Sequence, residues 1–370
     1  MSPVNIWWST EALPVSADMQ IQSHRGSYRV TFGNLTEAGL LGDGRAANRH
    51  LVDVNVARLH QDVLAPILDR PTTVLLEATE ENKSIEQIIP VIEGLVAGSC
   101  RRDDVLVAVG GGIVQDITCF IASTLLRGLR WRFIPTTLLA QADSCIGSKS
   151  SINLRSTKNI LGTFNPPEEV LVDPAFLDTL EPADVRSGIG EIIKVHVIDG
   201  PDAFHRLAAD FSVLADDRVR LQGYVEDSLR IKKRFIEVDE FDRGLRNVMN
   251  YGHSFGHAIE SATDFGIPHG IAVTIGMDMA NHIASARGLL DFGYRDAVHR
   301  VCRQNYEGSL GVQIPSDRLF EALSRDKKNV GTSVNLILPS GPGARMEKVA
   351  VGLDGEFRHQ CQDFLEGLRR

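Results

Sequence analysis

The sequence predicts an α/β domain followed by an all-α domain, and three observations lead to this fold class. Short apolar runs alternate with amphipathic helical patterns through the first half, which is typical of α/β proteins. From about Pro182 onward the strand signals fade and amphipathic helices dominate. At 370 residues the chain is also long enough for two hydrophobic cores. We therefore expect a first domain over residues 1–180 and a second over residues 181–370.

The individual elements follow from the spacing of apolar residues. In the first half, strands are expected near residues 28–32, 73–77, 105–109 and 170–173, and helices over residues 53–62 and 84–98. In the second half, helical spacing covers residues 219–235, 247–263 and 271–288, and one strand candidate stands at residues 334–339. The sequence has no internal repeat and no low-complexity linker. The two domains are therefore expected to pack directly against each other.

Composition excludes several classes of protein. The chain is 43% hydrophobic and 24% charged, as in globular proteins, and its net charge of -9 argues against a nucleic-acid surface. The N-terminus lacks a basic region followed by an apolar core, and no segment offers about 18 uninterrupted apolar residues, so we expect neither export nor membrane insertion. The five cysteines are scattered without a C-x-x-C pair. This predicts neither a disulfide framework nor a cysteine zinc site and favours a reducing cytoplasm.

The strand predicted to end at Val109 runs into three glycines, residues 110–112, and then into a helix. Glycines in this position let the backbone approach a pyrophosphate and present free N–H groups at a helix N-terminus. The pattern is not a strict G-x-G-x-x-G, because Gln115 occupies the place of the third glycine. A nucleotide site and a simple tight turn therefore both remain open. Asp53 and Asn55, which follow an earlier apolar run, could likewise hold a ribose or cap a helix.

A histidine-rich stretch, residues 250–260, suggests a metal site. His253 and His257 are four residues apart and would share one face of a helix, and His269 follows after a Gly-Ile-Pro break that can fold back. A catalytic zinc typically takes three nitrogen or oxygen ligands and leaves one position open. A carboxylate would then have to come from elsewhere in the chain. Taken alone, the pair is also compatible with a histidine packed on an apolar helix face.

Basic side chains gather in an otherwise acidic protein. We expect residues 127–166 to form a long connection after a strand, and loops of that length are usually functional. This segment carries Arg127, Asp143, Lys149, Lys158 and Asn159, and further cations are Lys194, Lys232, Arg246, Lys327 and Lys328. Single surface lysines are normally only solvated charges. The gathering of so many cations with the histidines nevertheless predicts a phosphorylated, anionic substrate.

A series of motifs gives a more specific indication. Over roughly residues 50–340 the chain contains, in this order, GGGIVQD, PTTLLAQADSCIGSK, KNILGTFNP, GEIIK, GLR, NYGHSFGHAIE, PHG and DKK. Together these segments closely resemble the 3-dehydroquinate synthase family and the wider group of sugar-phosphate cyclases. The resemblance implies a dinucleotide-binding α/β domain that holds NAD and a helical domain that holds Zn2+, with Co2+ as an alternative. It also implies a homodimer and a small anionic sugar phosphate as substrate.

The resemblance further implies a role for each matching residue. The metal ligands would be Glu191, His253 and His269. The catalytic group would be Asp143, Lys149, Lys194, Asn250 and His257, of which His257 helps to hold the substrate phosphate. Other substrate contacts would be Lys158, Asn159, Lys232, Arg246, Lys327 or Lys328 and, from the partner subunit, Arg127. The NAD contacts would be Asp53, Asn55, Glu80, Lys83, Gly111, Gly112, Asp116, Thr136, Thr137, Leu138, Thr179 and Asp184.

The implied activity is that of a lyase that uses NAD without net redox change. A ring hydroxyl is oxidised to a ketone, the acidified neighbouring C–H permits β-elimination of phosphate, and the ketone is reduced again before an aldol step closes the carbocycle. A guanidinium can bind a carboxylate with two hydrogen bonds, and cyclases that take neutral sugar phosphates tend to lack the arrangement around Arg246. We therefore expect 3-deoxy-D-arabino-heptulosonate 7-phosphate as substrate and 3-dehydroquinate as product.

The sequence departs from the family pattern at Gln115, Ser148, residues 150–151 and residues 154–156. None of these departures removes a named catalytic group, but alternatives stay open. The chain could be a specialised cyclase of secondary metabolism, acting on an amino or imino version of the same substrate, on sedoheptulose 7-phosphate or on an inosose precursor. It could instead be an NAD- and metal-dependent polyol or glycerol-phosphate dehydrogenase, which shares the two-domain plan. A third alternative is a catalytically inactive binding relative.

Overall fold

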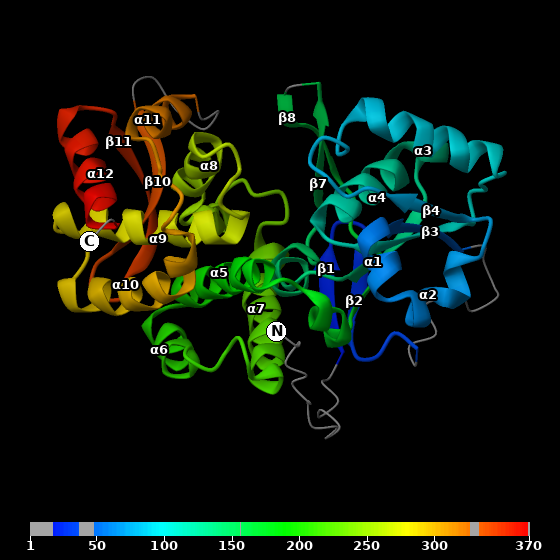
Figure 1. The fold of residues 1–370 in the computed structure, drawn as a ribbon, viewed down its shortest axis with the longest axis horizontal. Helices are drawn as coiled ribbons and strands as arrows, with labels where there is room; N and C mark the ends of the chain where they lie inside the picture. The colour runs from blue at the N-terminus through cyan, green and yellow to red at the C-terminus, as the bar shows by residue number, and fades with distance from the viewer. Residues whose placement is uncertain (1–17, 37–47, 156, 326–332, 369–370) are drawn as a thin grey trace, which may run out of the picture.

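The structure is a computed structural model that describes residues 18–36, 48–155, 157–325 and 333–368. Figure 1 shows two parts side by side, an α/β part built around one large sheet and a helical part. The last strand of the large sheet, β9, ends at Val172, and the long helix α5 (Pro182–Asp199) follows it. The domain boundary that we propose near residue 180 falls between these two elements.

The α/β part contains a seven-stranded sheet in the order β1-β2-β9-β6-β5-β3-β4. The strands are β1 (Met19–Ser23), β2 (Gly26–Phe32), β3 (Asn48–Asp53), β4 (Thr73–Leu76), β5 (Val105–Gly110), β6 (Arg130–Pro135) and β9 (Glu169–Val172). β1 pairs antiparallel with β2, and the other neighbouring pairs are parallel. β5 is buried along its whole length, as expected for a central parallel strand that is covered on both faces.

Helices cover both faces of this sheet. Successive side chains of a strand point to opposite sides, so apolar residues at both sets of positions contact helices on both faces. On one face, Val52 and Val107 belong to a core that includes residues of α1 (Val54–Leu59) and α2 (Gln61–Leu68). On the other face, Leu51 and Leu106 share a core with α3 (Ile85–Ala97) and α4 (Gly112–Thr124). The alternating direction of the side chains along β3 and β5 therefore sets which residues contact which pair of helices.

The strand order reverses between β3 and β5. From β3 the chain passes to β4 on one side, and later returns to β5 on the other side of β3. Such a switch point leaves a crevice at the carboxyl ends of the two strands, where open α/β sheets bind ligands. β3 ends at Asp53 and β5 ends at Gly110, so the fold brings the two nucleotide-type motifs of the sequence to the same edge.

The helical part is arranged around α9 (His269–Ala286), which is buried over most of its length. The surrounding helices are α5, α6 (Pro201–Asp210), α7 (Arg218–Val238), α8 (His253–Ala262), α10 (Phe292–Tyr306), α11 (Ser316–Ser324) and α12 (Gly355–Leu368). Two antiparallel strands, β10 (Ser333–Ser340) and β11 (Arg345–Gly352), complete it. Helix α7 also packs against β1, so the two parts touch directly, as the lack of a linker predicted.

The predicted order of an α/β part followed by a helical part is confirmed, and several details differ. Residues 127–166 are not a structureless connection, because they contain β6, the π-helical turn η2 (Ala140–Ser144) and a hairpin of β7 (Lys149–Leu154) and β8 (Thr157–Phe164). The helix expected over residues 247–263 is interrupted at Gly252. Its left-handed φ of 75° separates the 3-10 turn η4 (Leu245–Asn250) from α8.

Two further differences concern shorter elements. The helical pattern at residues 53–62 becomes two helices, α1 and α2, because the chain turns at His60. The strand candidate at residues 334–339 is confirmed as β10, and its partner β11 was not predicted. The second part is therefore helical with one added hairpin.

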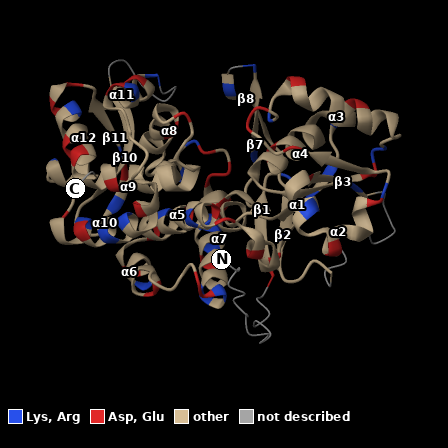
Figure 2. Cartoon of the chain, in the orientation of Figure 1, with Lys and Arg blue, Asp and Glu red and all other residues tan. Residues whose placement is uncertain are grey.

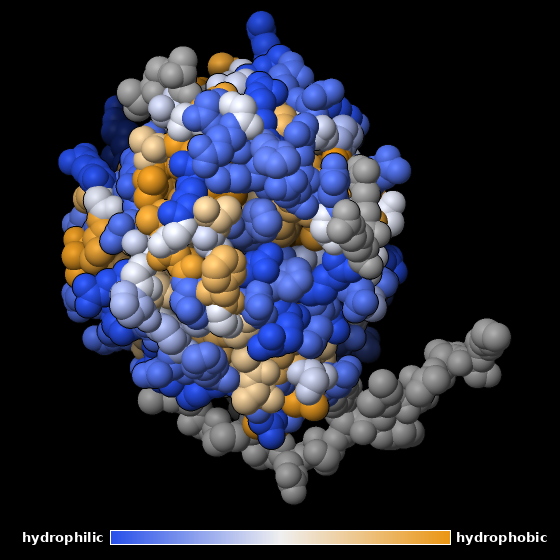
Figure 3. All heavy atoms as spheres, turned by 90° about the vertical axis from the view of Figure 1, so that its left-hand side faces the viewer, coloured by the Kyte–Doolittle hydropathy of each residue, from blue (hydrophilic) through white to orange (hydrophobic). Residues whose placement is uncertain are grey.

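Charged residues do not gather in one region of the fold. Residues of both signs are interspersed along the ribbon of both parts (Figure 2). On the face of the helical part drawn in Figure 3, hydrophilic residues dominate and hydrophobic residues form small separate patches. Among the described residues, no helix is long and apolar enough to cross a bilayer. Buried charges, which proteins rarely tolerate without a partner or a function, are therefore the better guide to a site.

A buried histidine in the sheet should make stability depend on pH. His50, in β3, is fully buried, and neither of its ring nitrogens has a hydrogen-bond partner among the described residues. Burial lowers the pKa of His50 to about 4. As pH falls below the ordinary pKa of histidine, the unfolded chain takes up a proton that the folded chain does not bind. The free energy of unfolding should therefore fall by about 3 kcal/mol between pH 7 and pH 4.

Urea denaturation of the wild type and of His50→Leu over this pH range measures the effect. The His50→Leu variant should lack this part of the pH dependence, because the group that titrates is gone. His359→Leu is the matched control, since the side chain of His359 is 75% exposed, and it should keep the wild-type dependence. Equal pH dependence in the wild type and in His50→Leu would contradict the prediction.

Candidate active site

The glycine turn lies at the switch point of the sheet, where backbone segments approach closely. A Cβ on Gly110 would lie 2.6 Å from Cγ2 of Val114, and one on Gly111 would lie 3.0 Å from Cγ2 of Thr137. The N–H of Thr136 donates to the carbonyl oxygen of Gly110 over 2.9 Å. Glycine is therefore required here for space. The turn also places the N-terminus of α4 at the crevice, which is a favourable place for a phosphate group.

Asp53 caps the N-terminus of α1, which is one of the two roles that its place in the sequence allowed. Its Oδ1 accepts the N–H of Asn55 over 2.7 Å and so caps α1. Asp53 also borders the glycine turn, because its Cβ would lie 3.4 Å from a Cβ on Gly110. Helix capping and a contact with a nucleotide ribose are compatible at this position. The nucleotide contacts of Asp53 and Asn55 stay predictions.

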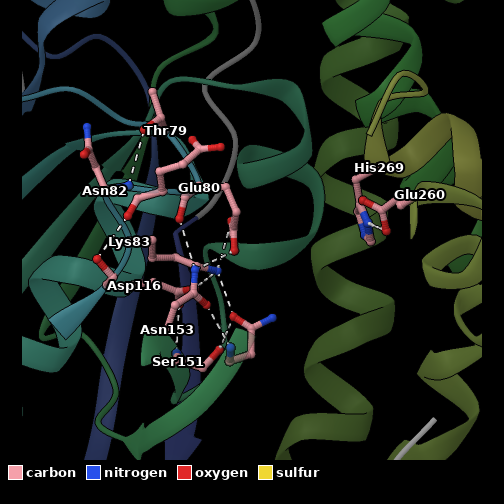
Figure 4. A network of polar contacts seen from close by, with 12 residues as sticks. Thr79, Glu80, Asn82, Lys83, Asp116, Ser151, Asn153, Glu260 and His269 are labelled. Atoms are coloured by element: carbon pink, nitrogen blue, oxygen red, sulfur yellow. Dashed lines mark hydrogen bonds and ion pairs between the residues drawn. The ribbon is translucent and has the colours of Figure 1, made fainter. Parts of the chain in front are cut away.

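A polar network lies beside the same turn (Figure 4). Nζ of Lys83 lies 3.5 Å from Oε2 of Glu80 and 3.3 Å from Oδ2 of Asp116, and it donates to Oδ1 of Asn159 over 2.9 Å. Burial raises the pKa of Asp116 to about 6, and Lys83 opposes this rise. The structure thus gathers three predicted NAD residues, Glu80, Lys83 and Asp116, and one predicted substrate residue, Asn159. Figure 4 shows His269 on the helices that face this network.

The remaining predicted NAD residues are distributed around this end of the α/β part. Thr136, Thr137 and Leu138 follow β6, and Leu138 packs so tightly on α5 that a Cβ on Gly188 would lie 2.4 Å from its Cγ. Gly112 is the first residue of α4, and Asp184 lies in the first turn of α5. Thr179 ends the 3-10 turn η3 (Pro174–Thr179), and its Oγ1 lies 2.8 Å from Nε2 of His60. Their contacts with a nucleotide stay predictions.

Three histidines and one glutamate converge between the helices of the second part. One ligand atom from each of His253, His257 and His269 lies within 4.8 Å of the others. Oε1 of Glu191 lies 3.8 Å from Nε2 of His253 and 3.4 Å from Nε2 of His269. Glu191 is 1% exposed, and its Oε1 accepts no hydrogen bond from the described residues. A buried carboxylate oxygen that faces two imidazole nitrogens fits a metal cation between them.

The two histidines that face Glu191 are oriented through their other ring nitrogens. Nδ1 of His253 lies 3.2 Å from the carbonyl oxygen of Tyr251, and Nδ1 of His269 lies 3.2 Å from Oε2 of Glu260. Because a carbonyl and a carboxylate act here as acceptors, Nδ1 of each ring is the donor, and Nε2 is the nitrogen of each ring that would bind a metal. Outer contacts of this kind are typical of metal-binding histidines. The arrangement favours Glu191, His253 and His269 as ligands.

Close helix packing brings these side chains together. A Cβ on Gly190 would lie 2.1 Å from the carbonyl oxygen of Gly270, and one on Gly270 would lie 1.8 Å from that of Ser187. Only glycine therefore allows α5 and α9 to touch at this point. The contact places Glu191, on α5, next to His269, the first residue of α9. The glycines of the GEIIK and PHG segments thus have a packing reason that also builds the site.

A chain of buried charges connects Glu191 to the α/β part. Nζ of Lys194 lies 2.5 Å from Oε2 of Glu191 and 3.0 Å from Oδ2 of Asp143, and Nζ of Lys232 lies 2.5 Å from Oδ1 of Asp143. Burial opposes the charge on both carboxylates. Lys194 and His269 outweigh it at Glu191, and Lys194 and Lys232 outweigh it at Asp143, so both pKa values lie below their usual values. Burial lowers the pKa of Lys232. Buried, paired charges of this kind can position and polarise substrate hydroxyls.

A cavity of about 180 Å³ opens beside this network. It is lined by Gly112, Gln115, Asp116, Ser144, Ile146, Lys149, Lys232 and Arg246. The cavity therefore lies between the glycine turn of the first part and the cations of the second. Lys149, on β7, pairs with Asp242, and Nη1 of Arg246 donates to the carbonyl oxygen of Glu240 over 2.7 Å. Three cations around one small cavity fit an anionic ligand.

Other predicted residues do not line this cavity. Nζ of Lys158 lies 3.4 Å from the centroid of the Phe265 ring, so its ammonium contacts an aromatic face of the helical part. Nδ2 of Asn250 donates to a backbone carbonyl three residues earlier, over 3.1 Å. Arg127 ends the 3-10 turn η1 (Leu125–Arg127), which follows the end of α4 away from the glycine turn. Their substrate contacts stay predictions. Lys327 and Lys328 lie outside the described residues.

The structure adds three residues that the sequence reasoning missed. Tyr251 and Glu260 orient the two histidines that face Glu191, and Asp242 pairs with Lys149. Tyr251 and Glu260 stand inside the histidine-rich stretch, so a search for acceptors near each histidine could have found them. Asp242 lies in a loop with a left-handed φ of 57°, and no pattern in the sequence points to it.

Comparisons with known proteins agree with this geometry. Two family models, described as 3-dehydroquinate synthase N-terminal and 3-dehydroquinate synthase C-terminal, match residues 73–187 and 188–329. A curated protein from Sinorhizobium medicae (strain WSM419), named 3-dehydroquinate synthase, is 38% identical over 309 residues, which are 79% of this chain and 80% of that protein.

Solved structures share the fold over nearly the whole chain. ValA, the 2-epi-5-epi-valiolone synthase from Streptomyces hygroscopicus subsp. jinggangensis 5008 with NAD+ and Zn2+ bound, has a TM-score of 0.78 at 27% identity, over 98% of this chain and 99% of its own. A 2-deoxy-scyllo-inosose synthase complexed with carbaglucose-6-phosphate, NAD+ and Co2+ has a TM-score of 0.80 at 22% identity, over 95% of this chain and 100% of its own. On the family models and the curated relative together, the chain belongs to the 3-dehydroquinate synthase family.

Proposed function

We propose that the protein converts 3-deoxy-D-arabino-heptulosonate 7-phosphate to 3-dehydroquinate and phosphate. The observation that carries the proposal is that the buried Lys194–Asp143–Lys232 network links the Glu191 cluster to the cavity that Lys232 and Arg246 line. A metal site and a nucleotide site would also fit a polyol dehydrogenase. The cationic cavity beside them fits a substrate that carries a carboxylate, as the heptulosonate phosphate does. The curated relative named 3-dehydroquinate synthase supports the same activity.

The residues fit NAD and a divalent metal such as Zn2+ or Co2+. The glycine turn at residues 110–112 presents the N-terminus of α4 at the switch point, where a pyrophosphate would bind. Glu191, His253 and His269 offer one oxygen and two nitrogen ligands and leave room for substrate. When bound, the metal would supply a Lewis acid for substrate hydroxyl oxygens, and NAD would supply a reversible hydride acceptor. The NAD+ with Zn2+ or Co2+ held by two solved relatives supports this pair.

The chain's own residues bind and orient the substrate. Lys232 and Arg246 would hold the carboxylate, because both line the cavity and a guanidinium can donate two parallel hydrogen bonds. Asp143 and Lys194 would contact hydroxyls near the metal, offering an acceptor and a donor that are already held in place by each other. The residues that would hold the phosphate are Lys149, Asn159, Asn250 and His257. Binding of the carboxylate and of the phosphate would hold the reacting carbons between them in a fixed position. Most of the rate enhancement by such a protein would come from this positioning.

We further propose a homodimer that works in the cytoplasm. Arg127 follows the end of α4, about 20 Å from the glycine turn at its start, which is farther than an arginine side chain can reach. A phosphate contact from Arg127 would therefore serve the site of another copy. The five free cysteines fit a reducing compartment.

Phosphate release at limiting NAD+ tests the proposed function. The purified, Zn2+-loaded protein is given NAD+ far below the substrate concentration, with the heptulosonate phosphate and sedoheptulose 7-phosphate offered in separate reactions. We expect many phosphates per NAD+ from the first substrate and none from the second, because only the first carries a carboxylate for Arg246. The measurement is a continuous assay of inorganic phosphate.

The other outcomes point to the alternatives. Release from sedoheptulose 7-phosphate alone would indicate a specialised cyclase and another role for Arg246. No release from either substrate, with NADH accumulating in proportion to an added polyol, would indicate a dehydrogenase. Either result would overturn the proposed function.

A further inference from the structure

The turn between β1 and β2, in the α/β part, contacts the segment of the helical part that carries Arg246. The hydroxyl of Ser23 donates to Oε1 of Glu240 over 2.7 Å, and the N–H of His24 donates to Oε2 over 2.7 Å. Nδ1 of His24 lies 3.0 Å from Oε1 as well. The side chain of Glu240 is only 10% exposed. Both carboxylate oxygens of Glu240 are thus engaged by the β1–β2 turn, which ties the two parts together at this point.

The same residue and its neighbour hold Arg246. The carbonyl oxygen of Glu240 accepts Nη1 of Arg246 over 2.7 Å, and Oδ2 of Asp239 accepts the N–H of Arg246 over 3.1 Å. Asp239 also accepts the N–H groups of Arg243 and Gly244, over 2.9 Å and 2.8 Å. The guanidinium and the backbone of Arg246 are therefore both fixed by the Asp239-Glu240 pair.

The β1–β2 hairpin supports the guanidinium from a second side. The N–H of Gly147 donates to the hydroxyl of Tyr28, on β2, over 2.9 Å. Gly147 lies so close to the guanidinium that a Cβ there would be 3.1 Å from Nη2 of Arg246. Tyr28 and Arg246 are both buried. One hairpin of the first part thus supports, through Glu240 and through Gly147, a side chain that belongs to the second part.

We propose that Glu240 is a positioning residue, which uses the β1–β2 turn to hold Arg246 in the orientation that binds the substrate carboxylate. The inference rests on the proposed function. The hairpin precedes residue 73, where the match to the family models begins, so it lies outside the matched residues. An arginine that is already held loses less conformational freedom when its ligand arrives. Glu240 therefore acts on substrate affinity more than on the chemical step.

Burial and charge agree with this assignment. Burial would raise the pKa of Glu240, but hydrogen bonds from Ser23 and His24 outweigh it and keep the carboxyl ionised. An ionised carboxylate accepts stronger hydrogen bonds than a neutral amide, so the turn is held more firmly by Glu240 than it would be by glutamine. The charge itself does not face the cavity, whose lining contains Arg246 and not Glu240.

Steady-state kinetics of Glu240→Ala and Glu240→Gln test the proposal. For the heptulosonate phosphate we expect KM to rise about tenfold or more in Glu240→Ala, with kcat changed less than about threefold and KM for NAD+ unchanged. Glu240→Gln keeps one acceptor oxygen and should fall between the wild type and Glu240→Ala. Glu237→Ala is the matched control, because Glu237 accepts the N–H of Gln22 in the same hairpin, and its ion pair among the described residues is with Lys233 and not with Arg246. It should stay within about twofold of the wild type.

A double variant decides whether Glu240 acts through Arg246. If it does, adding Glu240→Ala to Arg246→Ala should change KM by less than about a further twofold. Effects that multiply, or a fall in kcat with unchanged KM in Glu240→Ala, would overturn the proposal.

Amide hydrogen exchange in residues 239–246 gives a readout that does not need turnover. Exchange should be faster in Glu240→Ala and unchanged in Glu237→Ala, because only the first variant releases the segment that carries Arg246. Unchanged exchange in Glu240→Ala would overturn the positioning role. If the wild type releases no phosphate from the heptulosonate phosphate, the proposed function fails, and the exchange measurement still decides the role of Glu240.

Discussion

Glu191→Ala is expected to lose the bound metal and to lower kcat/KM by roughly four powers of ten, or about 5 kcal/mol of transition-state stabilisation. The reason is that Glu191 would supply the single carboxylate ligand, from a buried position where solvent cannot replace it well. Its Oε1 faces Nε2 of both His253 and His269, so its removal would take away the one carboxylate ligand and weaken the site. Elemental analysis of the purified variant and phosphate release measure the two effects.

His257→Ala is the control that separates the possible ligand sets. His257 lies in the same cluster, but the resemblance assigns it to the phosphate. We expect this variant to keep its metal and to lose activity through weaker phosphate binding. If His257→Ala loses the metal while Glu191→Ala retains it, the ligands are the three histidines and the assignment of Glu191 is wrong.

Arg246→Ala is expected to lower kcat/KM for the heptulosonate phosphate by roughly 100- to 1,000-fold, or about 3 to 4 kcal/mol. A buried guanidinium that lines the cavity would make two charge-assisted hydrogen bonds to the substrate carboxylate. Arg246→Lys should restore only part of the loss, because an ammonium cannot reproduce the paired geometry. Steady-state phosphate release with the heptulosonate phosphate measures both variants.

Arg243→Ala is the matched control for this prediction. Arg243 stands three residues away in the same loop, and its guanidinium lies 5.5 Å from the centroid of the Phe241 ring, outside the cavity lining. It should stay within about threefold of the wild type. A kcat/KM for Arg246→Ala equal to that of the wild type would mean that the substrate carries no carboxylate at this position.

Much of the fold could be predicted because many helices and strands have a local pattern of apolar residues. The apolar runs that became β2, β4, β5 and β9, and the helical spacing that became α3, α7 and α9, need no knowledge of distant residues. The break at Gly252 could not be predicted in this way, because it depends on a contact with a distant helix: a Cβ on Gly252 would lie 2.5 Å from Cγ of Met277, on α9. The hairpin β7–β8 was also missed, since a segment rich in Gly, Ser and Thr resembles a loop.

The residues of the candidate site also fall into those that a local pattern predicts and those that it does not. The pair His253 and His257 and the glycine turn were visible as patterns, whereas Glu191 entered only through the resemblance to a family. No spacing rule relates Glu191 to His269, 78 positions away, since the contact exists only where Gly190 and Gly270 let two helices touch. Asp242 and Glu240 were invisible for a related reason, because their importance depends on which side chains the loops beside them meet.

The pairing of Lys149 with Asp242 has a consequence for how a phosphate ester would enter and leave. The ammonium that would hold the phosphate already has an internal counter-ion, so an arriving phosphate exchanges places with a carboxylate instead of adding to a bare charge. The net gain is the difference between two ion pairs, which moderates affinity. After elimination, Asp242 would compete with the departing anion for Lys149. The protein would thus supply its own displacing ion, and release of the inorganic product would not depend on solvent alone.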